Sequence, residues 1–393
     1  MDNPINICYL SPKFKFIGGA EISLDRLIRS LPKKKINSTV MTMCINNNSD
    51  LVPGKDKINK KILCVSSPEA VLFSHTNGKR WYEIATRTLV DKLEIAGNPD
   101  IIYLNTLGLL AHPDLYEKLF GYEKPIIAKA TVANQFDLIK HAKKFLLSEK
   151  YAKFLSIHCI SREIEKRALK FGFKKSHLFY CPNLIDMRNF SRKRNISNPD
   201  LKKQLGPSNE LVFVYIGRFA AQKNIDKIVK IFKKLEKRRK KIKLLMIGYE
   251  SHPEIRPLIK KLKKASENII WVGKVDNRKI QGYLKAADCF IMASQDEGMS
   301  NALMEAMATG LCPIVPKNIS GMKDLIKDDV SGILYDSNDL DSLVGRLEKM
   351  NREKAENIGM EARKRVGILC DADRIASIHA NFYKEKVKKF PTK

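Results

Sequence analysis

The chain has 393 residues, of which 44% are hydrophobic, and a usual length of roughly 100 to 200 residues per domain predicts two domains or three. No apolar run reaches the ~20 residues that a membrane-spanning helix needs, which argues against an integral helical membrane protein. The formal net charge of +29 favours an anionic partner, and nucleic acid, anionic lipid, a polyanionic acceptor and simple compositional bias are the alternatives.

The N-terminus and the cysteines indicate the cellular compartment of the protein. The sequence MDNPINICYL lacks the charged start and small-residue cleavage site of a signal peptide, so we expect a cytosolic protein. The eight cysteines show no C-x-x-C spacing, and we expect reduced thiols, several of them buried. The chain has no zinc spacing, RNA-recognition motif or basic zipper, which makes an anionic membrane surface the preferred partner and compositional bias the alternative.

The first half of the chain alternates between strand-like and helical segments. An apolar β-prone segment at 5–10 precedes a loop ending in Gly18-Gly19, and helical spacing then runs from Glu21 to Leu31. Further segments are strands expected at 39–43, 61–65, 101–104, 125–128 and 154–160, and a helix from Trp81 to Ile95. This alternation predicts a doubly wound α/β domain, which we place at residues 1–186.

The second half repeats this organisation. Residues 187–210 are polar without an apolar period and predict a hinge linker. A second α/β domain is expected over 211–374, with strands at 211–216, 243–248, 269–273 and 289–292. Helical spacing of Ile375, Ile378 and Phe382 predicts a C-terminal helix.

Residues 290–313, FIMASQDEGMSNALMEAMATGLCP, have the pattern of a strand, an acidic loop and a helix. Ser300 or Asn301 is suited to cap this helix, and Gly310 to end it. A helix N-terminus offers unpaired N–H groups to phosphate, and Glu297 and Glu305 flank that end. Because carboxylates accept hydrogen bonds from sugar hydroxyls, this stretch predicts a site for a sugar nucleotide.

A second cluster of charge follows the strand at 211–216. Arg218 and Lys223 lie five positions apart, just after a strand and before a helix, so both can reach one anionic group. Two fixed cations and helix-end N–H groups would stabilise negative charge on a bound group without a metal. An Arg–Lys pair is common on so basic a chain, and its order relative to Glu297 and Glu305 gives it weight.

These motifs resemble those of the retaining glycosyltransferases of family 4, which have the two-domain GT-B fold. Glu297 and Glu305 resemble the E-x7-E element, Gly217-Arg218 with Lys223 resembles the G-R-x4-K segment, and Gly18-Gly19-Ala20-Glu21 resembles the glycine pair after the first strand. The segment 181–186 is similar to the one that closes the first domain, with Leu184 in place of a glycine. The resemblance implies two Rossmann-like domains facing each other across a cleft, with the last helix, 375–393, packed back on the first.

The resemblance also implies roles. Arg218 and Lys223 would bind the donor diphosphate, Glu297 would position the transferred sugar, and Glu305 would bind the ribose. Further donor contacts would come from Gly18 and Gly19, from Lys274 and Val275 near the base, and from the main chain of Met299, Ser300, Asn301, Ala302 and Leu303. The implied reaction moves a sugar from a UDP- or GDP-linked donor to a glycolipid, lipopolysaccharide or other surface glycan, with retention and without a metal or other cofactor.

One departure and one false match accompany the resemblance. Many members carry a histidine after a later strand of the first domain, and our placement puts Thr131 there. His112, His141 and His158 are nearby, and each is expected to be an ordinary surface or loop histidine. Asp371-Ala372-Asp373 has the letters of a metal-binding Asp-x-Asp motif, but side chains at i and i+2 diverge on a helix, so we expect no metal there.

Two basic segments and two alternative functions complete the predictions from the sequence. Residues 136–154 predict a basic amphipathic helix, which either lies on anionic headgroups or packs on the core with a solvated lysine face. Lys233 to Lys243 read as the exposed end of a helix. One alternative function is a nucleotide-sugar epimerase of similar fold, and another is a basic non-catalytic protein that binds nucleic acid or other polyanions.

Overall fold

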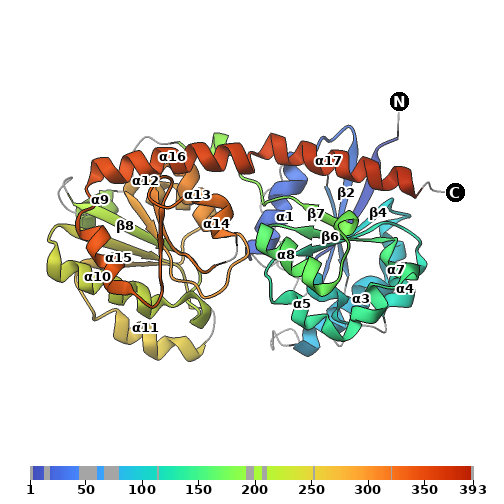
Figure 1. The fold of residues 1–393 in the computed structure, drawn as a ribbon, viewed down its shortest axis with the longest axis horizontal. Helices are drawn as coiled ribbons and strands as arrows, with labels where there is room; N and C mark the ends of the chain where they lie inside the picture. The colour runs from blue at the N-terminus through green and yellow to red at the C-terminus, as the bar shows by residue number, and fades with distance from the viewer. Residues whose placement is uncertain are drawn as a thin grey trace. The chain divides into compact units, whose positions relative to one another are not determined.

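The computed structural model describes residues 3–12, 18–43, 60–65, 79–112, 115–191, 199–205, 210–250, 253–319 and 321–390. The chain divides into two compact units, which are coloured along the sequence in Figure 1. The first unit comprises Met1–Leu184 and Ala372–Lys393, and the second comprises Ile185–Asp371. Among the described residues, no helix has the length and apolar content that crossing a bilayer requires.

The first unit is built on a seven-stranded parallel sheet with the order β3-β2-β1-β4-β5-β6-β7. The central strands β1 and β4 are nearly continuous apolar runs, as expected where helices cover both faces. The strand order reverses between β1 and β4, and ligands of such sheets bind at the strand ends beside this point. The strand bounds are β1 Ile5–Leu10, β2 Ile36–Met43, β3 Lys60–Val65, β4 Ile101–Leu104, β5 Ile126–Ala130, β6 Leu155–Cys159 and β7 Leu178–Tyr180.

Helix α17 completes the core of the first unit although it comes last in the chain. It spans Ala372–Lys389 and contacts α1, Gly19–Ser30, and strand β1. Its Ile375 and Tyr383 are buried among the side chains of β1 and α1. The other longer helices of this unit are α3 Lys79–Asp91, α4 Tyr116–Gly121 and α8 Arg162–Phe171.

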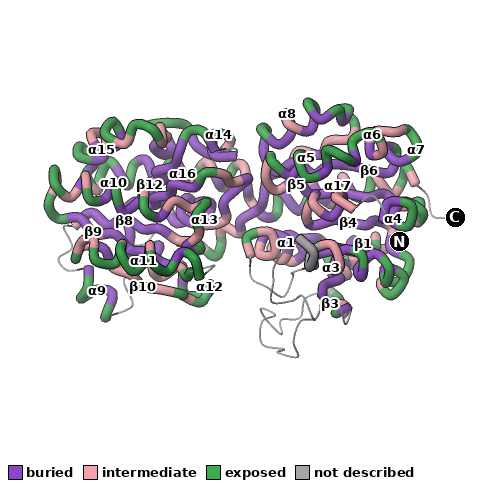
Figure 2. Tube along the Cα trace, turned by 90° about the horizontal axis from the view of Figure 1, so that it is seen from below, coloured by how far each residue is buried: buried purple, intermediate pink, exposed green. Residues whose placement is uncertain are grey.

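The second unit contains a six-stranded parallel sheet with the order β10-β9-β8-β11-β12-β13. The strand order reverses between β8 and β11, so this unit too has a switch point where ligands bind in such folds. Most residues of the central strands are buried, and exposed residues lie mainly on the helices and loops of both units (Figure 2). The strand bounds are β8 Leu211–Ile216, β9 Ile242–Ile247, β10 Ile269–Gly273, β11 Cys289–Ile291, β12 Cys312–Pro316 and β13 Ile333–Tyr335.

Seven helices of the second unit form two groups, each joined by contacts between its own helices. In one group, α10 contacts both α11 and α15. In the other, α13 contacts both α12 and α16, and α16 also contacts α14. The bounds are α10 Ile225–Arg238, α11 Arg256–Leu262, α12 Asn277–Ala286, α13 Asn301–Thr309, α14 Met322–Leu325, α15 Leu340–Glu348 and α16 Arg352–Cys370.

The predicted linker at 187–210 contains helix α9, Pro199–Leu205. Its Leu201 and Leu205 are buried, and their spacing of four residues is the only apolar period in this stretch. Two apolar positions were too few for the sequence to predict a helix, and the segment belongs to the second unit.

The prediction of one continuous amphipathic helix over residues 136–154 is wrong. The segment forms helix α5, Gln135–Leu138, a 3₁₀ turn, helix α6, Lys143–Leu146, and helix α7, Glu149–Ala152. Ser148 breaks the pattern with an extended backbone before α7. The apolar side of the segment is buried in the core of the first unit, at Phe136, Ile139 and Leu146. The segment thus packs against the core and leaves its lysines exposed.

Candidate functional site

Two loops of the second unit meet at its switch point, one after β8 and one after β11. Asn224 Nδ2 donates to Ala293 O at 2.9 Å, and Gln295 N donates to Gln222 O at 2.9 Å. Asn224 can link the loops because it adopts a left-handed conformation, φ 47°, which asparagine tolerates better than most residues. These bonds hold the predicted Arg–Lys segment beside the predicted glutamate loop.

Lys223 and Glu297 form an ion pair across these two loops. Their side chains are 15% and 18% exposed, so the pair is shielded but still open to a ligand. Ser294 Oγ donates to Glu297 Oε1 at 3.4 Å. Burial, followed by the charge of Glu297, raises the pKa of neighbouring Asp296. The structure therefore brings together two residues that lie 74 positions apart in the sequence.

Arg218 occupies the same loop with its side chain exposed. Its carbonyl accepts a hydrogen bond from the Tyr215 hydroxyl at 2.9 Å, which fixes the main chain at this position. Within the part of the chain that the structure describes, the Arg218 guanidinium has no hydrogen bond or ion pair. It is thus a cation available to an anionic ligand.

Helix α13 begins beside the ion pair. Ser300 caps it, because its Oγ accepts from Leu303 N at 3.4 Å, and Gly310 ends it with φ 89°. The side chains of Met299 and Leu303 are buried, so only their main chain is available to a ligand. Asn301, Ala302 and Glu305 are partly buried, and Glu305 lies one turn into the helix.

Lys274 and Val275 follow β10 in the same unit. Tyr249, which was not predicted from the sequence, lies beside Lys274. The Lys274 ammonium lies 5.5 Å from the ring centroid of Tyr249, which is 40% exposed at the end of β9. Gly248 N donates to Gly273 O at 2.9 Å and so ties these two strand ends together. An aromatic residue directly after a strand and its glycine was the available signal for Tyr249.

Gly18 and Gly19 lie in the first unit. Gly18 is the N-cap of α1, and a Cβ atom at this position would collide with the carboxylate of Glu21. This crowding gives a local reason for the glycine. The predicted approach of the two glycines to a diphosphate stays a prediction.

A polar cluster lies at the ends of β1, β4 and β5, where a histidine of the resembled family was missing. Thr131 N donates to Gln135 Oε1 at 2.7 Å, and Gln135 Nε2 donates to Thr106 Oγ1 at 2.7 Å. Asn105 Nδ2 donates to Ser11 Oγ at 3.1 Å, and its Oδ1 is buried without a hydrogen-bond partner. Asn105 directly follows β4 and Gln135 begins α5, and neither position has a periodic pattern that would predict it from the sequence.

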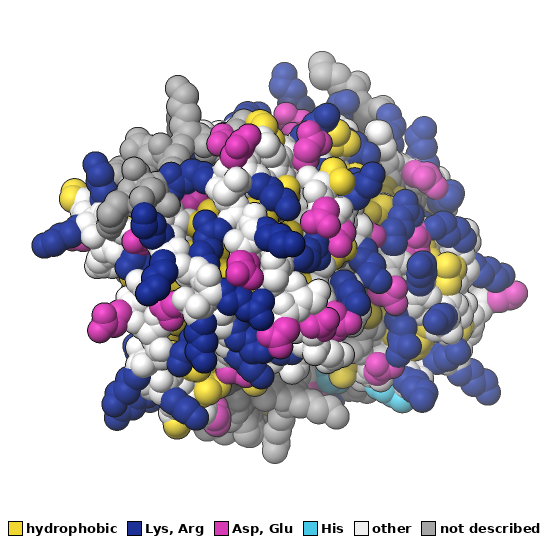
Figure 3. All heavy atoms as spheres, turned by 60° about the vertical axis from the view of Figure 1, so that its left-hand side comes forward, with side chains coloured by type: hydrophobic (Ala, Val, Ile, Leu, Met, Phe, Trp, Pro, Cys, Tyr) yellow, Lys and Arg dark blue, Asp and Glu magenta, His cyan; other side chains and the backbone are white. Residues whose placement is uncertain are grey.

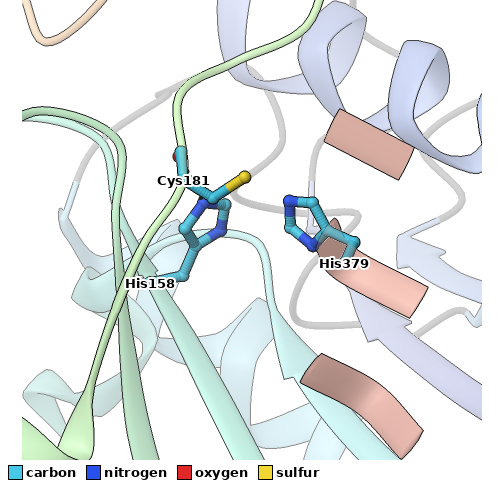
Figure 4. A group of neighbouring side chains, drawn as sticks. All are labelled: His158, Cys181 and His379. Carbon is cyan, nitrogen blue, oxygen red and sulfur yellow. Dashed lines mark hydrogen bonds between the residues drawn. The ribbon is translucent and has the colours of Figure 1, made fainter. Parts of the chain in front are cut away.

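The expectation that His158 is a surface or loop histidine is wrong, because it is buried on β6. Figure 4 shows it with Cys181 and His379, whose potential ligand atoms all lie within 4.8 Å of one another. His158 Nδ1 is 2.6 Å from the Tyr103 hydroxyl, and its Nε2 donates to Cys181 O at 2.8 Å. His141 is exposed, and His112 follows a 3₁₀ turn, as expected of ordinary histidines.

This buried cluster is better explained by its own hydrogen bonds than by a metal. Burial, and then the charge of Lys129, lower the pKa of His158 to about 3. Burial also lowers the pKa of Lys129, to about 8, so at neutral pH a protonated amine opposes a cation here. Lys129 Nζ donates to Ser23 Oγ at 2.8 Å.

The Asp-x-Asp letters at 371–373 fall between two helices. Asp371 is the C-cap of α16, and Asp373 lies in the first turn of α17. The two residues also belong to different units.

The fold corresponds to the class expected from the sequence: two parallel-sheet α/β domains of the GT-B type. Residues 197–365, which contain the whole candidate site of the second unit, match the family model described as glycosyl transferases group 1.

Curated relatives match the same half of the chain. The chain is 29% identical over 182 residues to the UDP-Gal:alpha-D-GlcNAc-diphosphoundecaprenol alpha-1,3-galactosyltransferase of Escherichia coli, covering 45% of this chain and 46% of that one. It is 30% identical over 164 residues to the alpha-monoglucosyldiacylglycerol synthase of Acholeplasma laidlawii, covering 40% of each. The chain thus spans about half the length of these relatives.

Solved structures resemble the whole chain. Anabaena HepE in complex with UDP and glucose has a TM-score of 0.73 at 15% identity, covering 97% of this chain and 99% of that one. The sucrose-phosphate synthase of Thermosynechococcus elongatus has a TM-score of 0.78 at 16% identity, covering 97% and 98%. At these identities the likeness establishes the fold.

Proposed function

We propose that this protein is a retaining glycosyltransferase, with a hexose as the transferred sugar, a UDP- or GDP-linked donor, and a glycolipid, lipopolysaccharide or other surface glycan as acceptor. The observation that carries the proposal is the meeting of Arg218, the Lys223–Glu297 pair and the start of α13 at the switch point of the second unit. The family model that covers this site supports it.

The donor diphosphate is the group that these charges suit. The Arg218 guanidinium is free to bind it, and Lys223 can turn from Glu297 towards phosphate oxygens. The opening N–H groups of α13 add further donors. Together they would stabilise the charge that develops on the leaving diphosphate, and we propose that transfer needs no metal or other cofactor.

The two glutamates and the strand ends account for the rest of the donor. Glu297 would accept hydrogen bonds from the sugar hydroxyls and Glu305 from the ribose, while Lys274, Val275 and Tyr249 border the base. In the proposed retaining step the bond from the anomeric carbon to the phosphate oxygen breaks. A bond from the acceptor oxygen to that carbon forms on the same face, and the acceptor proton passes to the leaving phosphate.

The acceptor we propose is lipid-linked. According to their names, one curated relative transfers galactose to a GlcNAc-diphosphoundecaprenol and another makes an alpha-monoglucosyldiacylglycerol, which supports a lipid-linked acceptor. Asn105, Thr131 and Gln135 offer polar groups for it at the strand ends of the first unit. We propose that the protein works in the cytoplasm, at the inner face of a membrane.

Calorimetric titration with a panel of UDP- and GDP-sugars tests the donor site. Glu305→Gln should weaken donor binding roughly tenfold or more, because a charged acceptor is lost. Arg218→Gln should lower kcat in a transfer assay with lipid-linked acceptors. The control is Arg278→Gln, an exposed arginine of α12 that pairs with Asp276.

Some outcomes would contradict the proposal. Wild-type donor affinity in Glu305→Gln would remove the ribose assignment. Binding of DNA with steep salt dependence, in a protein that binds none of the sugar nucleotides, would favour a polyanion-binding protein. Conversion of the donor sugar in the absence of any acceptor would favour an epimerase.

A further inference from the structure

The lysines of residues 140–153 form a basic surface on the first unit. Lys140, Lys143, Lys144, Lys150 and Lys153 are all exposed. Within the described residues none of them forms an ion pair, and Glu149 is the only acid between positions 138 and 153. This set, together with Leu138, is called the lysine face.

The side of this segment opposite the lysine face is anchored in the protein. Phe136, Ile139 and Leu146 are buried, and the rings of Phe145 and Tyr151 stack with centroids 3.8 Å apart. The Lys143 ammonium lies 5.6 Å from the ring centroid of Phe171 on α8. The lysines are therefore presented on a fixed scaffold of short turns, and no apolar stripe of the segment remains free to insert into a membrane.

The basic end of α17 lies against the same surface. The rings of Phe390 and Phe154 are 5.3 Å apart, which places the end of the helix beside Lys153. Lys384 and Lys388 are exposed near that end. Two segments that are distant in the sequence thus add positive charge to one region of the first unit.

We propose that the lysine face docks the protein on an anionic lipid bilayer. This inference rests on the proposed function, in which the acceptor is lipid-linked. Lysines near an anionic surface each add to binding without penetrating it. Leu138, 56% exposed beside Lys140, supplies an apolar tip at the headgroup level. Helix α5, which ends at Leu138, follows the end of β5 and the Thr131 loop, so docking brings the bilayer to the acceptor side of this unit.

A bilayer fits this surface better than nucleic acid does. Proteins that bind single-stranded nucleic acid stack bases on exposed aromatic rings. Tyr151 and Phe154, beneath the lysine face, are only 7% and 9% exposed, and the partly buried ring of Phe145 is already stacked on Tyr151.

General positive charge is the competing explanation, and it sets the control. Figure 3 shows lysine and arginine side chains spread over the whole face that it displays. Lys260, Lys261 and Lys264, on and just after α11 of the second unit, are exposed and have no ion pair among the described residues. Removing them takes away the same charge as removing three lysines of the lysine face.

The experiment is co-sedimentation of the full chain with phosphatidylcholine vesicles that contain or lack phosphatidylglycerol. We expect binding only with phosphatidylglycerol, and a loss of roughly tenfold or more in the triple variant Lys140→Gln, Lys143→Gln, Lys144→Gln. The triple variant Lys260→Gln, Lys261→Gln, Lys264→Gln should bind as the wild type does. Leu138→Gln should weaken binding, and Leu169→Gln, at a leucine 44% exposed on α8, should not.

Several results would overturn the proposal: no binding of the wild type, equal losses in the two triple variants, or tighter binding to a polynucleotide that depends on the same lysines. Lys144→Glu serves if the triple variant does not fold, as judged by its melting curve. Titration with sugar nucleotides is run on every variant. Wild-type donor binding in the triple variant separates failure of docking from failure of the proposed function.

Discussion

Lys223 and Glu297 illustrate what single residues contribute to this site. Each was expected there from a separate motif, and their ion pair links the two motifs directly. The pairing also means that neither charge is left unpaired in a half-buried position before a ligand arrives, which would be costly. Arg218, in contrast, keeps an exposed guanidinium and needs no internal partner.

The buried histidines lead to a prediction at the residue scale. Their pKa values are lowered by burial, that of His158 to about 3 and that of His379 well below its ordinary value. An unfolded histidine titrates near about 6.5, so below that pH the unfolded chain binds protons that the folded chain does not. Stability should therefore fall as pH decreases from about 6.5 towards about 3, with a slope of about 1.4 kcal/mol per pH unit for each such histidine.

Urea unfolding of the wild type at a series of pH values measures this slope. His158→Gln should be less stable at neutral pH but should lose less stability on acidification. His141→Gln, at an exposed histidine, should leave the wild-type slope unchanged. An acid slope in His158→Gln as steep as in the wild type would show that the buried imidazole is not its source.

At the scale of elements, the loops of the site depend on close approaches between strand ends. Gly248 has φ 156°, and a Cβ atom there would overlap the carbonyl oxygen of Gly217. Gly248→Ala should therefore destabilise the second unit by at least about 2 kcal/mol, because both the backbone and the neighbouring loop must move.

A matched glycine lies in the same unit. Gly282 is inside α12, and a Cβ atom there would meet nothing within 4 Å. Gly282→Ala should stabilise the protein by about 0.5 to 1 kcal/mol, because alanine is the better helix former. Thermal unfolding of both variants checks the pair, and equal effects of the two substitutions would refute the steric argument.

Elements with strong patterns were predictable, and those with weak patterns were not. Most strands of the two sheets and the α13 helix, with its serine cap and glycine end, were predicted from apolar runs and terminal residues. The strands β7, β12 and β13 were not predicted. Helix α9 was missed because only Leu201 and Leu205 are buried. The division of 136–154 into short helices was missed because the spacing of its buried residues suits one long helix as well.

The site shows the same limit. Motif spacing predicted Arg218, Lys223, Glu297 and the capped start of α13, and the structure brings these four together in the second unit. Asn105 could not be predicted, because its position depends on which strands are neighbours in the sheet. Tyr249 follows a strand and a glycine, but only the pairing of β9 with β10 brings it to Lys274. Strand order is a property of the tertiary fold that local sequence does not carry.

At the scale of the whole molecule, the chain leaves the first unit at Leu184 and re-enters it at Ala372. The first unit is consequently discontinuous, and its core includes Ala372, Ile375 and Tyr383 from α17. The core of the second unit, by comparison, consists of residues between Leu211 and Ile358. The two units should respond differently to loss of the C-terminus.

A chain that ends at Asp371 should lose the fold of the first unit and keep that of the second. Each buried side chain of α17 contributes roughly 1.5 to 3 kcal/mol, and several together exceed a marginal stability of about 5 to 15 kcal/mol. Limited proteolysis followed by mass spectrometry should show cleavage throughout residues 1–184 and protection of 211–358, whereas a chain that ends at Phe390 should resist as the wild type does. Protection of 1–184 in the shorter chain would mean that the core of the first unit is stable without α17. The seven-stranded sheet would then be held by α1, α3 and α8 alone.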